Sequence, residues 1–266
     1  NLIKNGDSVV FFNFRIDRPR QLTKAFVSGK FQKKLSDLFF VTMTEYETGL
    51  PVDVVFPLIT IIPNVGQLIS ENNLKQLRLT ESEKERFVSY YFNGQNEDPY
   101  KGEVRTIIPS PKVATYDKKP EMSAYEITDL LIRELKTNKY DFILVNFANA
   151  DMVGHTGDIE ACKHAIKVLD DCIEKISQSS LENNYSLIIT ADHGNIEQKI
   201  NPQTGDISTE HTANPVPFMF IDKEFKNKKI ELKSGKLCDV GTTILHLLGI
   251  KIPESMRGIN LIENII

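Results

Sequence analysis

An α/β fold is predicted by the way strand-like and helix-like segments alternate along the 266 residues. Short runs rich in β-branched and aromatic residues recur between longer segments whose apolar residues follow the helical period. The composition, 41% hydrophobic and 26% charged, is that of a globular protein that buries one large core or two modest ones.

The first part of the chain has the pattern of a βαβ-like unit. Its predicted elements are a strand buried on both faces at 9–12, a helix at 20–26 and a second buried strand at 38–43. A polar, turn-rich stretch follows, and residues 54–63 predict an extended crossing segment leading into a helix at 65–71. We therefore expect two domains, 1–63 and 64–266.

The second part continues the alternation. The predicted elements are a strand at 87–92, a long loop at 93–120, a helix at 124–136, strands at 142–146, 186–190 and 218–221, and helices at 159–176 and 239–248, the last capped by Gly249. Helix 159–176 places one apolar stripe toward the sheet, formed by Cys162, Ala165, Ile166, Leu169, Cys172, Ile173 and Ile176.

Charge and cysteine content exclude several classes of protein. Thirty-two basic residues against 36 acidic ones give a net charge of −4, so we expect no nucleic-acid or anionic-membrane partner. The apolar stretch at 54–62 is interrupted by a proline and is far shorter than the ~20 residues of a membrane span. Three cysteines without CxxC spacing favour a reducing, cytoplasmic compartment, and no GxxxxGK[ST] or GxGxxG motif indicates a nucleotide enzyme.

Candidate metal ligands follow the predicted strands. They lie in three short segments and comprise Asp151, His155, Asp192, His193 and His211. Open α/β sheets place ligands beyond the carboxyl ends of strands, and carboxylate with imidazole suits manganese or zinc. A single Asp-His pair after a strand is more often a turn with a surface imidazole, but three such segments favour a metal site. His164 and His246 lie off the apolar stripes of their helices, so we expect both on the surface.

Several segments carry a resemblance to a known family. They are DMVGHTG at 151–157, ADHGN at 191–195, HTANPVP at 211–217, FNFRIDR at 12–18, YFNG at 91–94, SPKVATYD at 110–117 and KPEM at 119–122. Together they resemble the cofactor-independent phosphoglycerate mutases of the alkaline phosphatase superfamily. The resemblance covers essentially the whole chain and corresponds to the C-terminal portion of the family.

The resemblance implies a role for each matching residue. Asp151, His155 and His211 would bind one manganese ion, whereas Asp192 and His193 would belong to a second. Arg15 and Arg18 would clamp the anionic substrate, because guanidinium groups bind phosphate or carboxylate bidentately. Lys84 would be a catalytic and substrate-binding residue that faces the transferring phosphoryl group; alternatively, it is a solvated helix charge.

The resemblance also implies the architecture. We expect an alkaline-phosphatase-like three-layer α/β/α domain at 64–266, preceded at 1–63 by the end of a second α/β domain, the phosphotransferase domain. In the family, a nucleophilic serine and a further aspartate ligand lie in a segment that these 266 residues do not contain. The isolated fragment is therefore expected to be inactive.

The expected activity is the interconversion of 3-phosphoglycerate and 2-phosphoglycerate through a phosphoserine intermediate. It would use two Mn²⁺ ions, with Mg²⁺, Co²⁺ or Zn²⁺ as alternatives, need no 2,3-bisphosphoglycerate, and operate in a cytoplasmic monomer. Two alternatives remain: a metal-dependent phosphatase or sulfatase of the same superfamily, and a catalytically silent metal-binding fragment. Arg15 and Arg18 favour the mutase, since a hydrolase has no need to retain its dephosphorylated product.

Overall fold

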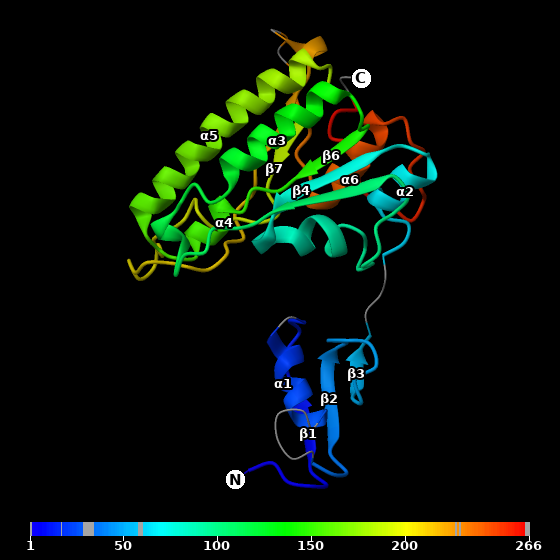
Figure 1. Ribbon diagram of the computed structural model, residues 1–266, viewed down its shortest axis with the longest axis vertical. Coiled ribbons are helices and arrows are strands. Elements are labelled where there is room, and N and C mark those ends of the chain that lie inside the picture. The colour runs from blue at the N-terminus through cyan, green and yellow to red at the C-terminus, as the bar shows by residue number, and fades with distance from the viewer. Residues whose placement is uncertain are drawn as a thin grey trace. The chain divides into compact units, whose positions relative to one another are not determined.

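The computed structural model describes residues 2–16, 18–28, 35–57, 61–226, 228 and 230–263. The chain divides into two compact units, Asn1–Thr60 and Ile61–Ile266, and Figure 1 shows the elements of each. In the described part of the chain, no helix combines the length and the apolar character needed to cross a bilayer.

In its described residues, the first unit is a parallel three-stranded sheet with one helix. Its elements are β1 (Ser8–Phe11), α1 (Arg18–Val27), β2 (Phe39–Thr44) and β3 (Asp53–Phe56), with the strands in the order β1-β2-β3. The predicted βαβ unit is therefore present. Two details differ from the prediction: Val10 on β1 is 64% exposed, so this strand is not buried on both faces, and β3 occupies part of the expected crossing segment. Residues 58–60 of that segment lie outside the described residues.

Two sheets are present in the part of the second unit that the structure describes. A parallel sheet in the order β5-β4-β6 comprises β4 (Gln76–Glu81), β5 (Glu103–Ile108) and β6 (Phe142–Val145). An antiparallel pair comprises β7 (Leu187–Thr190) and β8 (Phe218–Ile221). The helices are α2 (Val65–Glu71), α3 (Ala124–Thr137), α4 (Asn149–Gly154), α5 (Ile159–Glu182) and α6 (Leu237–Leu247), and the short helical turns are η1 (Ser82–Lys84), η2 (Phe87–Tyr91), η3 (Tyr116–Lys118) and η4 (Lys223–Phe225).

Helices cover both faces of the parallel sheet, which makes three layers. Leu77 and Leu79 on β4 pack against α3 and α5, whereas Phe142 on β6 packs with α2 and α6 on the other face. Figure 1 shows α3 and α5 side by side along the sheet. This arrangement follows from the alternation of strand side chains between the two faces.

The predicted strand at 87–92 is wrong. Residues Phe87–Tyr91 form a π-helical turn, and the strand of this region is β4, which lies earlier in the chain. Gln76 and Arg78 made β4 look polar, yet both side chains are fully buried. The predicted loop at 93–120 likewise contains β5, which pairs with β4 along its whole length.

The helix predictions agree better with the structure. The helix expected at 159–176 extends to Glu182, and Cys162 and Cys172 are buried on it as expected, although Ile166 is 46% exposed. Gly249 follows α6 with a positive φ of 67°, a conformation that ends a helix at low cost only for glycine.

Candidate metal centre

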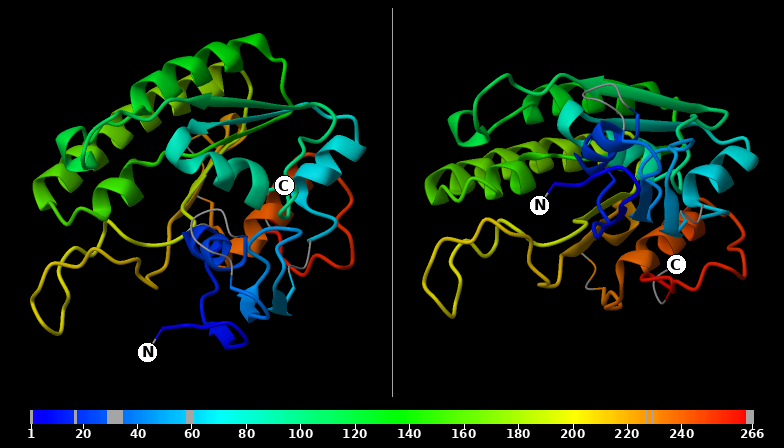
Figure 2. Two further views of the ribbon diagram at one scale, coloured as in Figure 1. Left: turned by 60° about the horizontal axis from the view of Figure 1, so that its bottom comes forward. Right: turned by 90° about the horizontal axis from the view of Figure 1, so that it is seen from below.

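Asp151 lies on α4, which follows β6, and His155 is the residue that caps the C-terminus of this helix. Asp151 and His155 are four residues apart, a spacing that places side chains on one face of a helix. His211 reaches the same place from the connection between β7 and β8. Figure 2 shows this long connection, drawn in yellow, extending away from α3 and α5.

Asp151, His155 and His211 form a compact three-ligand group whose ligand atoms all lie within 4.8 Å of one another. Asp151 Oδ1 is 3.0 Å from His155 Nε2 and 3.0 Å from His211 Nε2, and the two Nε2 atoms are 3.1 Å apart. His155 Nδ1 lies 2.7 Å from the carbonyl oxygen of Thr209. Because that oxygen only accepts hydrogen bonds, the neutral imidazole carries its proton on Nδ1, which leaves Nε2 as the nitrogen that can bind a metal ion. One carboxylate and two imidazoles arranged in this way fit a divalent cation.

Lys84 and Asn195 hold the Asp151 carboxylate from two sides. Lys84 Nζ forms an ion pair with Asp151 Oδ2, and Asn195 Nδ2 donates to Oδ1 at 2.8 Å. Burial raises the pKa of the Asp151 carboxyl, but the Lys84 hydrogen bond and charge, with smaller contributions from Asn195 and His155, outweigh burial and lower that pKa to about 2. The carboxylate is therefore ionised and available as a ligand over the whole physiological range.

Lys84 is 6% exposed. The alternative that it is a solvated helix charge is therefore wrong. Its ammonium group also lies 4.5 Å from the centre of the Phe87 ring, which covers it from one side. Lys84 thus places a fixed positive charge against the three-ligand group.

Asp192 and His193 border the three-ligand group without joining it. The His193 ring stacks on the His211 ring with centroids 3.8 Å apart, and His193 Nε2 is 3.6 Å from Asp192 Oδ2. The structure therefore brings the second pair of predicted ligands next to the first set through His211.

Glu197 ties together the segments that carry His193 and His211. Its carboxylate accepts hydrogen bonds from the backbone N–H of Asn195 at 2.7 Å, from Asn214 Nδ2 at 2.9 Å and from the Thr212 hydroxyl. Burial raises the pKa of Glu197, but these hydrogen bonds lower it to about 2. Sequence reasoning assigned no role to Glu197 or Asn195, although Asn195 lies within a segment that carried the resemblance.

The remaining residues singled out in the sequence are not members of the three-ligand group. Arg15 and Arg18 belong to the first unit, where both are exposed and Arg18 begins α1. His164 and His246 are exposed on α5 and α6, as predicted. Lys199, which no motif marked, is buried beside Asn195.

Comparison with known proteins identifies relatives for both units. The model of the Metalloenzyme superfamily matches residues 59–252, and that of the BPG-independent PGAM N-terminus matches residues 1–48. A 2,3-bisphosphoglycerate-independent phosphoglycerate mutase of Clostridium botulinum is 49% identical over 265 residues, covering 98% of this chain and 52% of the relative. One from Methanosarcina barkeri is also 49% identical, with 98% of this chain and 50% of the relative covered.

A solved structure shares the fold. The phosphoglycerate mutase of Leishmania mexicana, determined at low cobalt concentration, superposes with a TM-score of 0.80 at 27% identity and covers 97% of this chain and 51% of that chain. This chain therefore spans about half the length of the relatives it matches.

Proposed function

This chain belongs to the Metalloenzyme superfamily, and from that premise we propose that it supplies the metal centre and part of the substrate site of a cofactor-independent phosphoglycerate mutase. The observation that carries the proposal is the three-ligand group of Asp151, His155 and His211 with the Lys84 ammonium held against it. The reaction would be the isomerisation of 3-phosphoglycerate and 2-phosphoglycerate through a phosphoserine whose serine lies outside these 266 residues.

The superfamily and the donor set support the use of a divalent metal ion. We assign one Mn²⁺ to Asp151, His155 and His211 and a second to a site that includes Asp192 and His193, with Mg²⁺, Co²⁺ or Zn²⁺ as alternatives. When bound, the two ions would neutralise the phosphoryl oxygens and acidify the attacking hydroxyl.

The side chains of this chain would bind and orient the substrate. Lys84 would place its ammonium against a phosphoryl oxygen, because it is a fixed donor next to the metal ligands. Arg15 and Arg18 would hold the carboxylate of the glycerate while it reorients, since a guanidinium group binds a carboxylate with two parallel hydrogen bonds. Retention of the dephosphorylated glycerate is what separates a mutase from a hydrolase in this scheme.

The same proposal includes a cytoplasmic monomer. All three cysteines are free, Cys162 and Cys172 buried on α5 and Cys238 exposed, as expected of a protein from a reducing compartment.

Reconstitution tests the activity. We would assay 3-phosphoglycerate isomerisation in Mn²⁺ with the 266-residue chain alone, with the part of the Clostridium botulinum relative outside the matched region alone, and with both together. Isomerisation by the mixture only is expected. Release of inorganic phosphate without isomerisation would indicate a phosphatase rather than a mutase. Turnover by the 266-residue chain alone would contradict the proposal that the nucleophilic serine lies outside it.

The substrate residues need their own controls within this assay. Arg18→Lys should raise KM for the phosphoglycerates, because a lysine cannot form the bidentate contact. Arg133 on α3 is exposed and lies on the helix layer of the second unit, so Arg133→Lys is a matched control that should leave KM unchanged.

A further inference from the structure

Lys199 is a buried lysine with no acidic partner in the ion pairs of the described residues. Its side chain is 7% exposed, and its ammonium group donates to the carbonyl oxygen of Gly154 at 3.0 Å and to Asn195 Oδ1. Lysine is rarely buried without an ion-pair partner, because removal of its charge from water is costly. The two hydrogen-bond acceptors that hold its ammonium group therefore indicate that Lys199 has a structural or functional role in this region.

The side chain of Asn195 connects Lys199 to the three-ligand group. Asn195 is 4% exposed, and its Nδ2 donates to Asp151 Oδ1 at 2.8 Å and approaches the Asp151 carbonyl oxygen at 3.3 Å. One end of this amide thus faces two acceptors on Asp151, and the other end faces the donor on Lys199.

Only one orientation of the amide satisfies all these neighbours. An ammonium group donates hydrogen bonds and cannot accept them, whereas the carboxylate and carbonyl of Asp151 can only accept. If the amide were rotated by half a turn, its oxygen would face the Asp151 oxygens and its NH₂ group would face the ammonium. Lys199 therefore selects the orientation that donates to the ligand carboxylate.

Gly154 makes the close approach of this amide possible. A Cβ atom at position 154 would lie 2.5 Å from Asn195 Oδ1, and the carbonyl group of the same residue receives the Lys199 ammonium. The backbone of α4 thus accommodates Asn195 and anchors Lys199 at a single residue, next to His155.

We propose that Lys199 is a positioning residue for Asp151 and acts through the side chain of Asn195, whose NH₂ group it holds toward the ligand carboxylate. This inference rests on the metal centre proposed above. Asp151 is then fixed on Oδ2 by Lys84 directly and on Oδ1 by Lys199 through Asn195. Residues that support a metal ligand in this way typically change metal affinity about 10–100-fold when removed.

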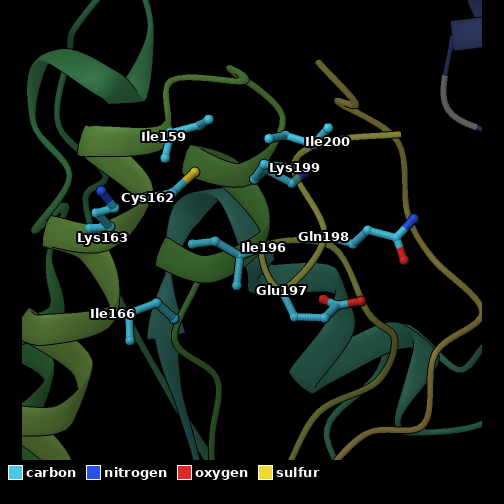
Figure 3. A pocket seen from close by; sticks show the side chains of 9 residues that line it. All are labelled: Ile159, Cys162, Lys163, Ile166, Ile196, Glu197, Gln198, Lys199 and Ile200. Atoms are coloured by element: carbon cyan, nitrogen blue, oxygen red, sulfur yellow. The ribbon is translucent and has the colours of Figure 1, made fainter. Parts of the chain in front are cut away.

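Two substitutions distinguish a positioning role of Lys199 from an effect of its charge alone. Lys199→Met removes the donor, whereas Lys199→Gln keeps an uncharged N–H donor. By titration calorimetry with Mn²⁺, Lys199→Met should bind about 10-fold more weakly than the unsubstituted protein, and Lys199→Gln should recover most of that loss. Figure 3 shows that Lys163 lines the same groove as Lys199, but Lys163 is exposed and pairs with Glu160, so Lys163→Met is the matched control and should leave the affinity unchanged.

The opposite results overturn the proposal. If Lys199 acted only as a cation near the metal, both variants would bind Mn²⁺ more tightly, because a repulsion would be removed. Equal affinity in all variants would show that Lys199 positions nothing. Failure of the unsubstituted protein to bind Mn²⁺ would overturn the metal centre itself, and this inference with it.

A double-mutant cycle distinguishes positioning from a general loss of structure. In an Asn195→Leu background, Lys199→Met should cause no further loss of Mn²⁺ affinity, whereas additive losses would mean that Lys199 does not act through Asn195. If Lys199→Met fails to fold, the unsubstituted protein still provides a test by NMR. The Asn195 side-chain NH₂ protons should be protected from solvent exchange, and rapid exchange would contradict their hydrogen bonding to Asp151.

Discussion

Lys84 and Asp151 form a partly buried ion pair although 67 positions separate them in the sequence. Lys84 ends η1, just after β4, and Asp151 lies on α4, just after β6, which is the neighbour of β4 in the sheet. The parallel pairing of β4 and β6 therefore brings the two side chains together beyond the carboxyl ends of these strands.

Replacement of Lys84 by methionine should destabilise the metal-free protein. Removal of one partner leaves the partly buried Asp151 carboxylate without its counter-charge, which we expect to lower the free energy of unfolding by up to about 3 kcal/mol. Saturating Mn²⁺ should restore most of this loss, because a bound cation replaces the ammonium. Urea unfolding in EDTA and in Mn²⁺ measures both effects, and Lys163→Met, which breaks an exposed pair with Glu160, is the control. An equal loss in both solutions would contradict the predicted exchange of charges.

Replacement of His211 by alanine should weaken Mn²⁺ binding by at least about 100-fold, since it removes one ligand atom of three rather than a supporting contact. His246→Ala is the matched control, because His246 is exposed on α6. Titration calorimetry compares the two, and an unchanged affinity in His211→Ala would count against the ligand assignment.

Gly154→Ala should also reduce Mn²⁺ affinity, although alanine usually favours a helix over glycine by about 1 kcal/mol. The new Cβ would lie 2.5 Å from Asn195 Oδ1 and would displace the amide that holds Asp151. Gly241→Ala on α6 is the control, since its nearest neighbour would be a Val65 methyl group at 3.1 Å. Equal metal affinities in the two variants would show that the displaced amide is unimportant.

Glu81→Gln should stabilise the protein in a pH-dependent manner. Glu81 is fully buried at the end of β4, and burial raises the pKa of its carboxyl above the ordinary value of 4.5. The folded state then holds this proton more tightly than the unfolded state, so stability is lost as pH rises from 4.5 through the raised pKa.

A glutamine side chain at position 81 does not titrate, so its contribution to stability does not change with pH. The melting temperature of Glu81→Gln should therefore exceed that of the unsubstituted protein by a few degrees at pH 8 and match it near pH 4. Glu126→Gln, on the exposed side of α3, should show no difference at either pH. A gain of the same size at both pH values would mean that ionisation of Glu81 is not the cause.

The sequence predicted the α/β class because most strands and helices keep their expected hydrophobic periods. It failed at β4, where the side chain of Arg78 is buried against the rings of two phenylalanines. The guanidinium carbon lies 4.3 Å from the centre of the Phe92 ring and 5.2 Å from that of Phe142. Phe142 lies on β6, which is far from β4 in the sequence although it pairs with β4 in the sheet, so no local pattern could have marked Arg78 as a core residue.

In the metal centre, too, some residues could be predicted from the sequence and others could not. Asp151, His155 and His211 lie in short segments whose residue types already indicate metal binding. Lys199 carries no such signal, because its importance depends on an amide and a carbonyl group contributed by separate segments. Contacts of this kind become visible only once the chain is folded.

The hydrogen bonds of Glu197 have a consequence for the way this region opens. The Glu197 carboxylate accepts hydrogen bonds from Asn195, Thr212 and Asn214. The segment that carries His193 therefore cannot separate from the segment that carries His211 without breaking these hydrogen bonds. We therefore expect the two segments to unfold locally as one cooperative unit. In amide hydrogen exchange, the residues near His193 and those near His211 should lose protection together and at the same rate.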